Sequence, residues 1–157
     1  MPFLFSIRPK YCSAIFAGAK TVELRRRCSP RVAAGDLMFI YETSPIKAIT
    51  GVAFISSVER YSIDALWPVA RERASVSRVE FDDYFSGVEF GFAIGLERVQ
   101  RLSQPTALNV MWDKCRLRPP QSYCSLKGTS AAKLIQHEFE IRPRHELPDS
   151  GGRSPCD

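Results

Sequence analysis

The sequence predicts a mixed α+β protein built around a small, partly open β-barrel, with helices packed at its ends. Three observations support this fold class. Five or six short strand-like segments fall within residues 1–142, and helical patterns interrupt them after the first strand and again after the fourth. Residues 88–97 alternate between large apolar side chains and small or acidic ones, which is the period-2 pattern of a strand.

The chain begins with a strand and a helix. Residues 3–7 are mostly apolar and predict a short first strand. Apolar side chains recur at helical spacing through residues 10–19, so we expect a helix there. Pro9 suits the first turn of this helix and Gly18 suits its C-terminal end.

A second strand is predicted over residues 21–25. Side chains alternate across a strand, so Val22 and Leu24 share one face and Glu23 and Arg25 share the other. We expect the apolar pair to point into the core. The charged pair then faces a cleft or solvent, and we expect Glu23 to be accessible, so that Glu23→Gln leaves the melting temperature nearly unchanged.

The middle of the chain predicts two strands and two helices. After a loop over residues 28–35, strands are expected at residues 36–41 and 47–60, with a bulge or tight bend at Gly51. A helix capped by Ser62 follows, and its Pro68 is expected to kink or split it. The next helix opens with a capping-box pattern, Ser77 and Glu80, and ends at Gly87 before the strand at residues 88–97.

The C-terminal third predicts less regular structure. We expect a loop from Pro105 and an irregular segment over residues 118–126. A helix is expected over residues 129–137 and a last strand over residues 139–142. Pro, Gly, Ser and charged residues then dominate, which predicts one domain over residues 1–142 and a disordered tail over residues 143–157.

Composition excludes several classes of protein. No apolar run is long enough for a transmembrane helix, and the N-terminus lacks the pattern of a signal peptide. The five cysteines are scattered and never form a Cys-x-x-Cys pair, and only two histidines are present. We therefore expect reduced thiols in a cytoplasmic protein that binds no metal and no other cofactor.

Charge is distributed unevenly around the formal net charge of +5. Residues 1–35 contain seven lysines and arginines and one glutamate, and residues 36–100 contain six basic and ten acidic residues. This asymmetry indicates a positive surface patch near the N-terminus, although a solvated charged face would give the same pattern.

The segment "SIRPKYCSAIFAGAKTVELRRR" resembles the opening signature of the ASCH family in the PUA-like superfamily. That signature is a strand, a helix and a G-x-K-x-x-E-x-R stretch, which Gly18, Lys20, Glu23 and Arg25 match. "GDLMFIYETSPIKAITG" and the later "PPQSY" are similar to further family segments, so the resemblance spans residues 3–126.

The resemblance implies a PUA-like barrel with a cleft that binds RNA or a modified nucleoside. Some relatives are thought to bind RNA in the regulation of translation or transcription. Others are metal-independent hydrolases that cut RNA or act on acylated modified cytidine. In the small amidohydrolase branch, the position that matches Glu23 is usually threonine and the chain is shorter.

The residues themselves support a mixed cationic and aromatic site, because phosphates need cations and bases need planar partners. Cations, hydroxyls and rings are expected to converge there from distant parts of the chain: Arg8, Lys10, Lys20, Glu23, Arg25, Tyr41, Ser44, Lys47, Gln121, Ser122 and Tyr123.

Two functions remain open. The first is an RNA-binding module without catalysis, which we favour because no catalytic motif is complete. The second is a hydrolase in which Lys20 and Glu23 form the catalytic pair. A surface salt-bridge cluster at Lys20, Glu23 and Arg25 without any function is the structural alternative.

Overall fold

A computed structural model describes residues 1–130 of the chain. This part folds into a six-stranded sheet and four helices. In chain order the elements are β1 (Pro2–Ile7), α1 (Pro9–Phe16), β2 (Val22–Arg25), β3 (Leu37–Glu42), β4 (Ala48–Ser62), α2 (Ile63–Arg73), α3 (Arg78–Phe85), β5 (Phe90–Ala107), α4 (Leu108–Cys115) and β6 (Tyr123–Ser125).

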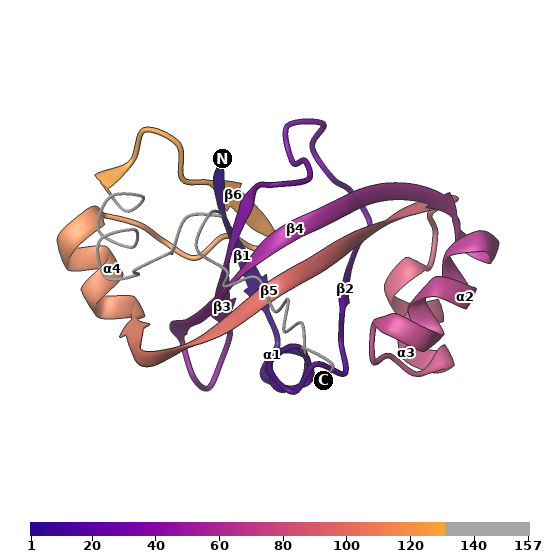
Figure 1. The fold of residues 1–157 in the computed structure, drawn as a ribbon, viewed down its shortest axis with the longest axis horizontal. Coiled ribbons are helices and arrows are strands. Elements are labelled where there is room, and N and C mark those ends of the chain that lie inside the picture. Colours follow the sequence, from indigo (N-terminus) through magenta and orange to yellow (C-terminus); the bar gives the residue numbers. More distant parts are fainter. Residues whose placement is uncertain (131–157) are drawn as a thin grey trace, which may run out of the picture.

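The sheet curls into a half-barrel with the strand order β2-β5-β4-β3-β1-β6. β1 runs parallel to β3, and the other pairs are antiparallel. The long strands β4 and β5 form a ribbon across the molecule, with α2 and α3 at one end and α4 at the other (Figure 1). The predicted α+β class and the partly open barrel are therefore confirmed.

Three apolar clusters hold these layers together. One face of the sheet packs on α1 through side chains such as Phe5, Ile15 and Ile40. The opposite face packs on α4 through Met111 and its neighbours. A third cluster joins β2 and β5 to α2 and α3, and it contains Val22. The site described below lies beside this third cluster.

Local sequence signals position most of the helices. Pro9 occupies the first turn of α1, and Ser62 caps α2 by accepting a hydrogen bond from Ala65 N. Ser77 and Glu80 form the predicted capping box at the start of α3. None of the helices in residues 1–130 is long and apolar enough to cross a membrane.

Several predicted boundaries were wrong. β5 starts at residue 90 instead of 88 and continues to residue 107, through the predicted loop at Pro105. Pro105 is accommodated because it is exposed and lies in an irregular stretch between the β4–β5 pairs Gly51↔Arg101 and Ile49↔Thr106.

α4 and β6 were not predicted, because the apolar face of α4 is short and β6 has only three residues. Pro68 lies inside α2 without splitting it. The strand predicted at 139–142 and the tail at 143–157 lie outside the described residues, as does the predicted helix at 129–137 beyond its first two positions.

Gly51 marks an irregularity in β4, as its sequence context predicted. The β4–β5 register shifts between Ile49 and Gly51. A Cβ atom at Gly51 would lie 2.3 Å from the Phe16 ring and 2.8 Å from the Gln100 carbonyl oxygen. The close approach of β5 and α1 at this point therefore requires glycine.

We expect Gly51→Ala to lower the free energy of unfolding by about 1–3 kcal/mol, because the new methyl group forces the ring and the β5 backbone apart. Urea denaturation followed by circular dichroism measures the change. An unchanged denaturation midpoint would show that the half-barrel is looser here than the structure indicates.

Candidate functional site

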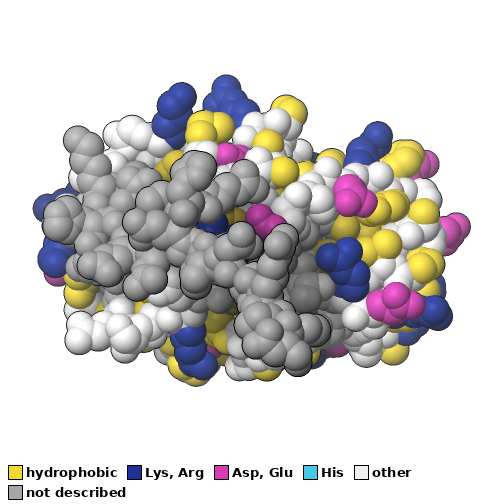
Figure 2. Space-filling model, viewed as in Figure 1, with side chains coloured by type: hydrophobic (Ala, Val, Ile, Leu, Met, Phe, Trp, Pro, Cys, Tyr) yellow, Lys and Arg dark blue, Asp and Glu magenta, His cyan; other side chains and the backbone are white. Residues whose placement is uncertain are grey.

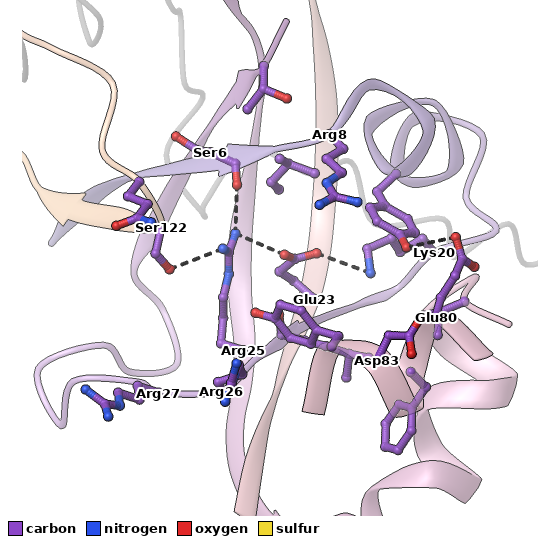
Figure 3. A pocket seen from close by; sticks show the side chains of 18 of the residues that line it. Ser6, Arg8, Lys20, Glu23, Arg25, Arg26, Arg27, Glu80, Asp83 and Ser122 are labelled. Carbon is purple, nitrogen blue, oxygen red and sulfur yellow. Dashed lines mark hydrogen bonds and ion pairs between the residues drawn. The ribbon is translucent and has the colours of Figure 1, made fainter. Parts of the chain in front are cut away.

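A cavity of about 1050 Å³ opens where the half-barrel fails to close (Figure 3). Its walls come from β2, the end of β1, α3 with the residues around it, and the segment before β6. The lining residues are Ser6, Ile7, Arg8, Tyr11, Lys20, Glu23, Leu24, Arg25, Arg26, Arg27, Thr43, Val76, Glu80, Phe81, Asp83, Tyr84, Val88, Gln121 and Ser122.

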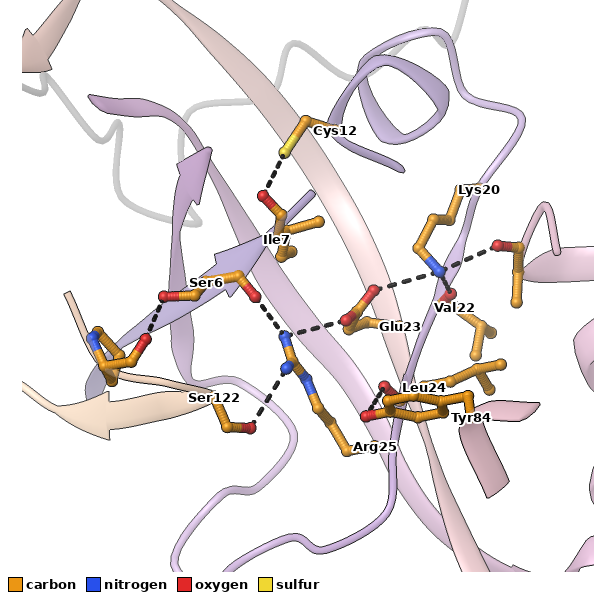
Figure 4. Close-up of polar contacts among 12 residues, drawn as sticks. Ser6, Ile7, Cys12, Lys20, Val22, Glu23, Leu24, Arg25, Tyr84 and Ser122 are labelled. Carbon is orange, nitrogen blue, oxygen red and sulfur yellow. Dashed lines mark hydrogen bonds and ion pairs between the residues drawn. The ribbon is translucent and has the colours of Figure 1, made fainter. Parts of the chain in front are cut away.

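A buried ion network forms the floor of the cavity (Figure 4). Glu23 Oε2 lies 3.2 Å from Lys20 Nζ, and Glu23 Oε1 lies 3.0 Å from Arg25 Nη2. All three residues are buried: Lys20 is 3% exposed, and Glu23 and Arg25 are each 7% exposed. Their location in the cavity wall agrees with the predicted orientation of β2, but the expectation that Glu23 is solvent-accessible was wrong.

Lys20 has no free donor in this network. Its ammonium group donates to Val22 O at 2.8 Å and to Ala74 O at 3.0 Å, in addition to its ion pair with Glu23. An ammonium group has three N–H donors, so these three acceptors use all of them. This geometry supports a role for Lys20 in fixing β2 against the end of α2, and it leaves no hydrogen available for a ligand.

Arg25 spans the seam between the two ends of the sheet. Its Nη1 donates to Ser122 Oγ at 3.2 Å and its Nη2 donates to Ser6 O at 3.0 Å. The guanidinium carbon lies 5.3 Å from the centre of the Phe5 ring. The Arg25 side chain therefore links β2 to β1 and to the β6 segment, which no strand pairing within residues 1–130 connects to β2.

Further cations surround the opening of the cavity. Arg8, Arg26 and Arg27 are exposed lining residues, and Arg26 Nη2 donates to Ser86 O at 3.0 Å. On the face seen in Figure 2, the visible lysine and arginine side chains are scattered over the described part and form no continuous patch. Five basic side chains from the N-terminal segment line the cavity together with three carboxylates. The positive surface patch near the N-terminus stays a prediction.

Glu80 links α3 to α1 at one side of the cavity. It forms an ion pair with Lys10 and accepts a hydrogen bond from Tyr11 Oη at 3.4 Å. The hydrogen bond from Lys10, followed by those at Ser77, lowers the pKa of Glu80 to about 2. The carboxylate is therefore charged throughout the physiological pH range, and the link between the two helices persists there.

Two tyrosines supply aromatic surface. The Tyr84 ring is 41% exposed and its hydroxyl lies 3.5 Å from Leu24 O. Burial of the hydroxyl raises the pKa of Tyr84 above its usual value. Burial also raises the pKa of the Tyr11 hydroxyl. The centre of the Tyr11 ring lies 5.2 Å from Lys20 Nζ. Both phenols are therefore neutral near pH 7 and can donate hydrogen bonds.

The structure brings some of the predicted site residues together. Six line the cavity: Arg8, Lys20, Glu23, Arg25, Gln121 and Ser122. Lys10 is near but is paired with Glu80 and does not line the cavity.

The other four predicted residues lie elsewhere. Tyr41 is 3% exposed and packs in the apolar cluster against α4, because its position in β3 turns the ring to the opposite face of the sheet. Ser44 and Lys47 lie in the exposed turn after β3, where Thr43 reaches the cavity instead. Tyr123 stacks on Phe5 with ring centres 4.8 Å apart and packs against the apolar cluster between the sheet and α1.

Sequence reasoning missed the contribution of α3. Glu80, Asp83 and Tyr84 of α3 were not among the predicted site residues, and neither were Tyr11 of α1 or Arg26 and Arg27 just after β2. The capping box located Glu80 on a helix, but no local pattern shows which distant element that helix faces.

No group of three or more potential metal ligands occurs within residues 1–130. The expectation that the protein works without a metal stays a prediction.

The buried network makes a direct stability prediction. We expect Glu23→Gln to lower the free energy of unfolding by about 3–5 kcal/mol, because it leaves two buried cations without their anion. The exposed pair Arg78–Asp82 provides a matched control, and Asp82→Asn should cost less than about 1 kcal/mol. Equal midpoints for the two variants in urea denaturation would contradict the network's structural role.

Comparisons with known proteins identify the family. The ASCH domain model matches residues 5–111. An ASCH domain-containing ribonuclease from Zymomonas mobilis is 32% identical over 139 residues, which cover 88% of this chain and 93% of the relative.

Solved structures agree with this match. The crystal structure of ASCH from Zymomonas mobilis has a TM-score of 0.80 at 29% identity and covers 87% of this chain and 94% of that one. A serine-to-alanine variant of ZmASCH from the same organism gives a TM-score of 0.79 at 30% identity, with 87% and 95% coverage. The resemblance inferred from the sequence motifs is thus confirmed, and the chain belongs to the ASCH domain family.

Proposed function

We propose that this protein binds single-stranded RNA in the cavity between β2, β1 and α3. The observation that carries the proposal is the arrangement of charge: exposed arginines surround an opening whose interior combines aromatic walls with a buried ion network. Exposed arginines suit phosphates, and aromatic walls suit unpaired bases.

The comparison with the Zymomonas mobilis relative supports RNA over other polyanions. That relative is named a ribonuclease, and the match extends over nearly its whole length. Because the two sequences match over most of both chains, we infer the same class of ligand, RNA, for this protein. A regulatory role in translation or transcription, with a modified nucleoside as a narrower ligand, remains compatible with the same cavity.

A second candidate function is RNA cleavage, and the name of this relative is the observation that favours it. Cleavage needs cations placed where negative charge develops on the phosphate. Arg25 is held in a fixed position by Glu23, Ser6 and Ser122, so it is preorganised for that purpose. In this candidate Lys20 and Glu23 act as positioning residues, because their polar groups are already engaged with each other and with Arg25 or the backbone.

RNA affinity should fall steeply with salt if the arginines at the opening contact phosphates. The log–log slope is expected to be about −0.7 for each phosphate contact on a single strand. Arg8→Ala or Arg27→Ala should reduce the slope by about one contact. Fluorescence anisotropy of a labelled RNA measures the affinity at salt concentrations from about 50 to about 200 mM, and the slope follows from these values.

Arg31→Ala is the matched control for this titration, because Arg31 is exposed in the same basic segment but does not line the cavity. An affinity of the unmodified protein that does not change with salt would indicate a neutral nucleoside ligand.

Turnover separates the two candidate functions. If the second candidate function holds, RNA fragments should accumulate in proportion to protein in the presence of EDTA, and Ser122→Ala should slow their formation because it removes one partner of Arg25. Gel analysis of a labelled RNA oligomer provides the measurement, with acylated cytidine as a second substrate. Binding without fragments from either substrate would leave RNA binding as the function.

A further inference from the structure

Within residues 1–130, one edge of β2 is unpaired, and this strand lines the cavity. In this part of the chain β2 is the terminal strand of the sheet and pairs only with β5. Leu96 N donates to Thr21 O at 2.9 Å, so the Thr21 carbonyl faces β5, while Thr21 N donates to Arg73 O at 2.8 Å just before the strand begins. Backbone polar groups alternate in direction along a strand. The odd-numbered residues of β2 therefore face β5, and Val22 and Leu24 direct their N–H and C=O groups to the open edge.

Side-chain contacts agree with this alternation. Val22 O accepts a hydrogen bond from Lys20 Nζ at 2.8 Å, and Leu24 O accepts a long one from Tyr84 Oη at 3.5 Å. The Leu24 side chain packs in the apolar cluster with α2 and α3, yet the residue lines the cavity. By the alternation described above, the Leu24 N–H and C=O point to the open edge and not to β5.

The length of the open edge determines what can bind there. Val22 does not line the cavity, and its carbonyl accepts from Lys20 at 2.8 Å. Leu24 lines the cavity, and its carbonyl has two lone pairs, one of which accepts the long hydrogen bond from Tyr84, so Leu24 provides an adjacent donor and acceptor there. An added peptide strand needs a row of such groups and would meet the Lys20 ammonium group on its path. A single planar group with a neighbouring acceptor and donor needs only one N–H and one C=O.

We propose that the main chain of Leu24 hydrogen-bonds the Watson–Crick edge of one unpaired RNA base, with the Tyr84 ring beside it. This inference rests on the proposed function, because it assumes that the cavity binds RNA. Every RNA base has a donor next to an acceptor on that edge, so the site accepts different bases. It excludes paired bases, whose Watson–Crick edges are already occupied.

Modified oligomers test the inference without altering the protein. The probes are three fluorescein-labelled octamers of uridine, N3-methyluridine and C5-methyluridine, with their integrity checked by gel. N3-methylation removes the base donor on the Watson–Crick edge, and C5-methylation adds the same group at the opposite edge. We expect N3-methylation to weaken binding about tenfold and C5-methylation to leave it within about twofold.

Each outcome bears on a distinct claim. Equal affinities of the uridine and N3-methyluridine octamers would overturn the base contact and leave RNA binding intact. Absence of binding by all three octamers would overturn the proposed function and the inference with it. Displacement of the uridine octamer by an extended valine–threonine octapeptide would show that the edge accepts a peptide strand and would also overturn the inference.

A pair of proline variants tests the same contact from the protein side. Proline removes an N–H group, and edge strands tolerate it where that group points away from the sheet. Leu24→Pro removes the N–H at the cavity, and Val22→Pro removes an equivalent N–H outside the cavity lining. With folding verified by circular dichroism, Leu24→Pro should bind the uridine octamer about tenfold more weakly than Val22→Pro. Equal affinities of the two folded variants would contradict the proposal.

Discussion

The carboxylate of Glu23, held between Lys20 and Arg25, is the interaction on which the site depends. It lies at the end strand of a sheet that curls without closing, and both of its oxygens are engaged by buried cations. Lys20 ties this strand to the end of α2, and Arg25 ties it across the seam to Ser6 and Ser122. The network thus keeps the two ends of the sheet connected while leaving a cavity between them.

A buried ion network adds little net free energy to the link between two strands, because the free energy needed to remove the charges from water offsets most of their mutual attraction. An ordinary strand pairing across the seam would have closed the barrel and removed the cavity. The arrangement keeps charged groups in fixed positions beside an open cavity, and the proposed RNA site needs such fixed positions. The apolar clusters on either side supply the stability that the seam lacks.

The sequence predicted this site in part, because some of its determinants are local. Alternation along β2 placed Glu23 and Arg25 on one face, and the capping box located the helix that carries Glu80. Which side of the sheet Tyr41 faces depends on the register with β1, and no local pattern encodes it. The same limit applies to Tyr84, since only the packing of α3 against β2 brings it to the cavity. Burial of the whole of β2 also escaped prediction, because a charged side chain normally indicates solvent.

The most direct test of this account is a crystal structure of the protein with a bound uridine octamer. The account predicts one base in the cavity against the main chain of Leu24, with phosphates at Arg8 and Arg27 and the network of Glu23 unchanged. Density for the octamer on another surface, such as the arginines of β5 at Arg98 and Arg101, with the cavity empty would contradict it.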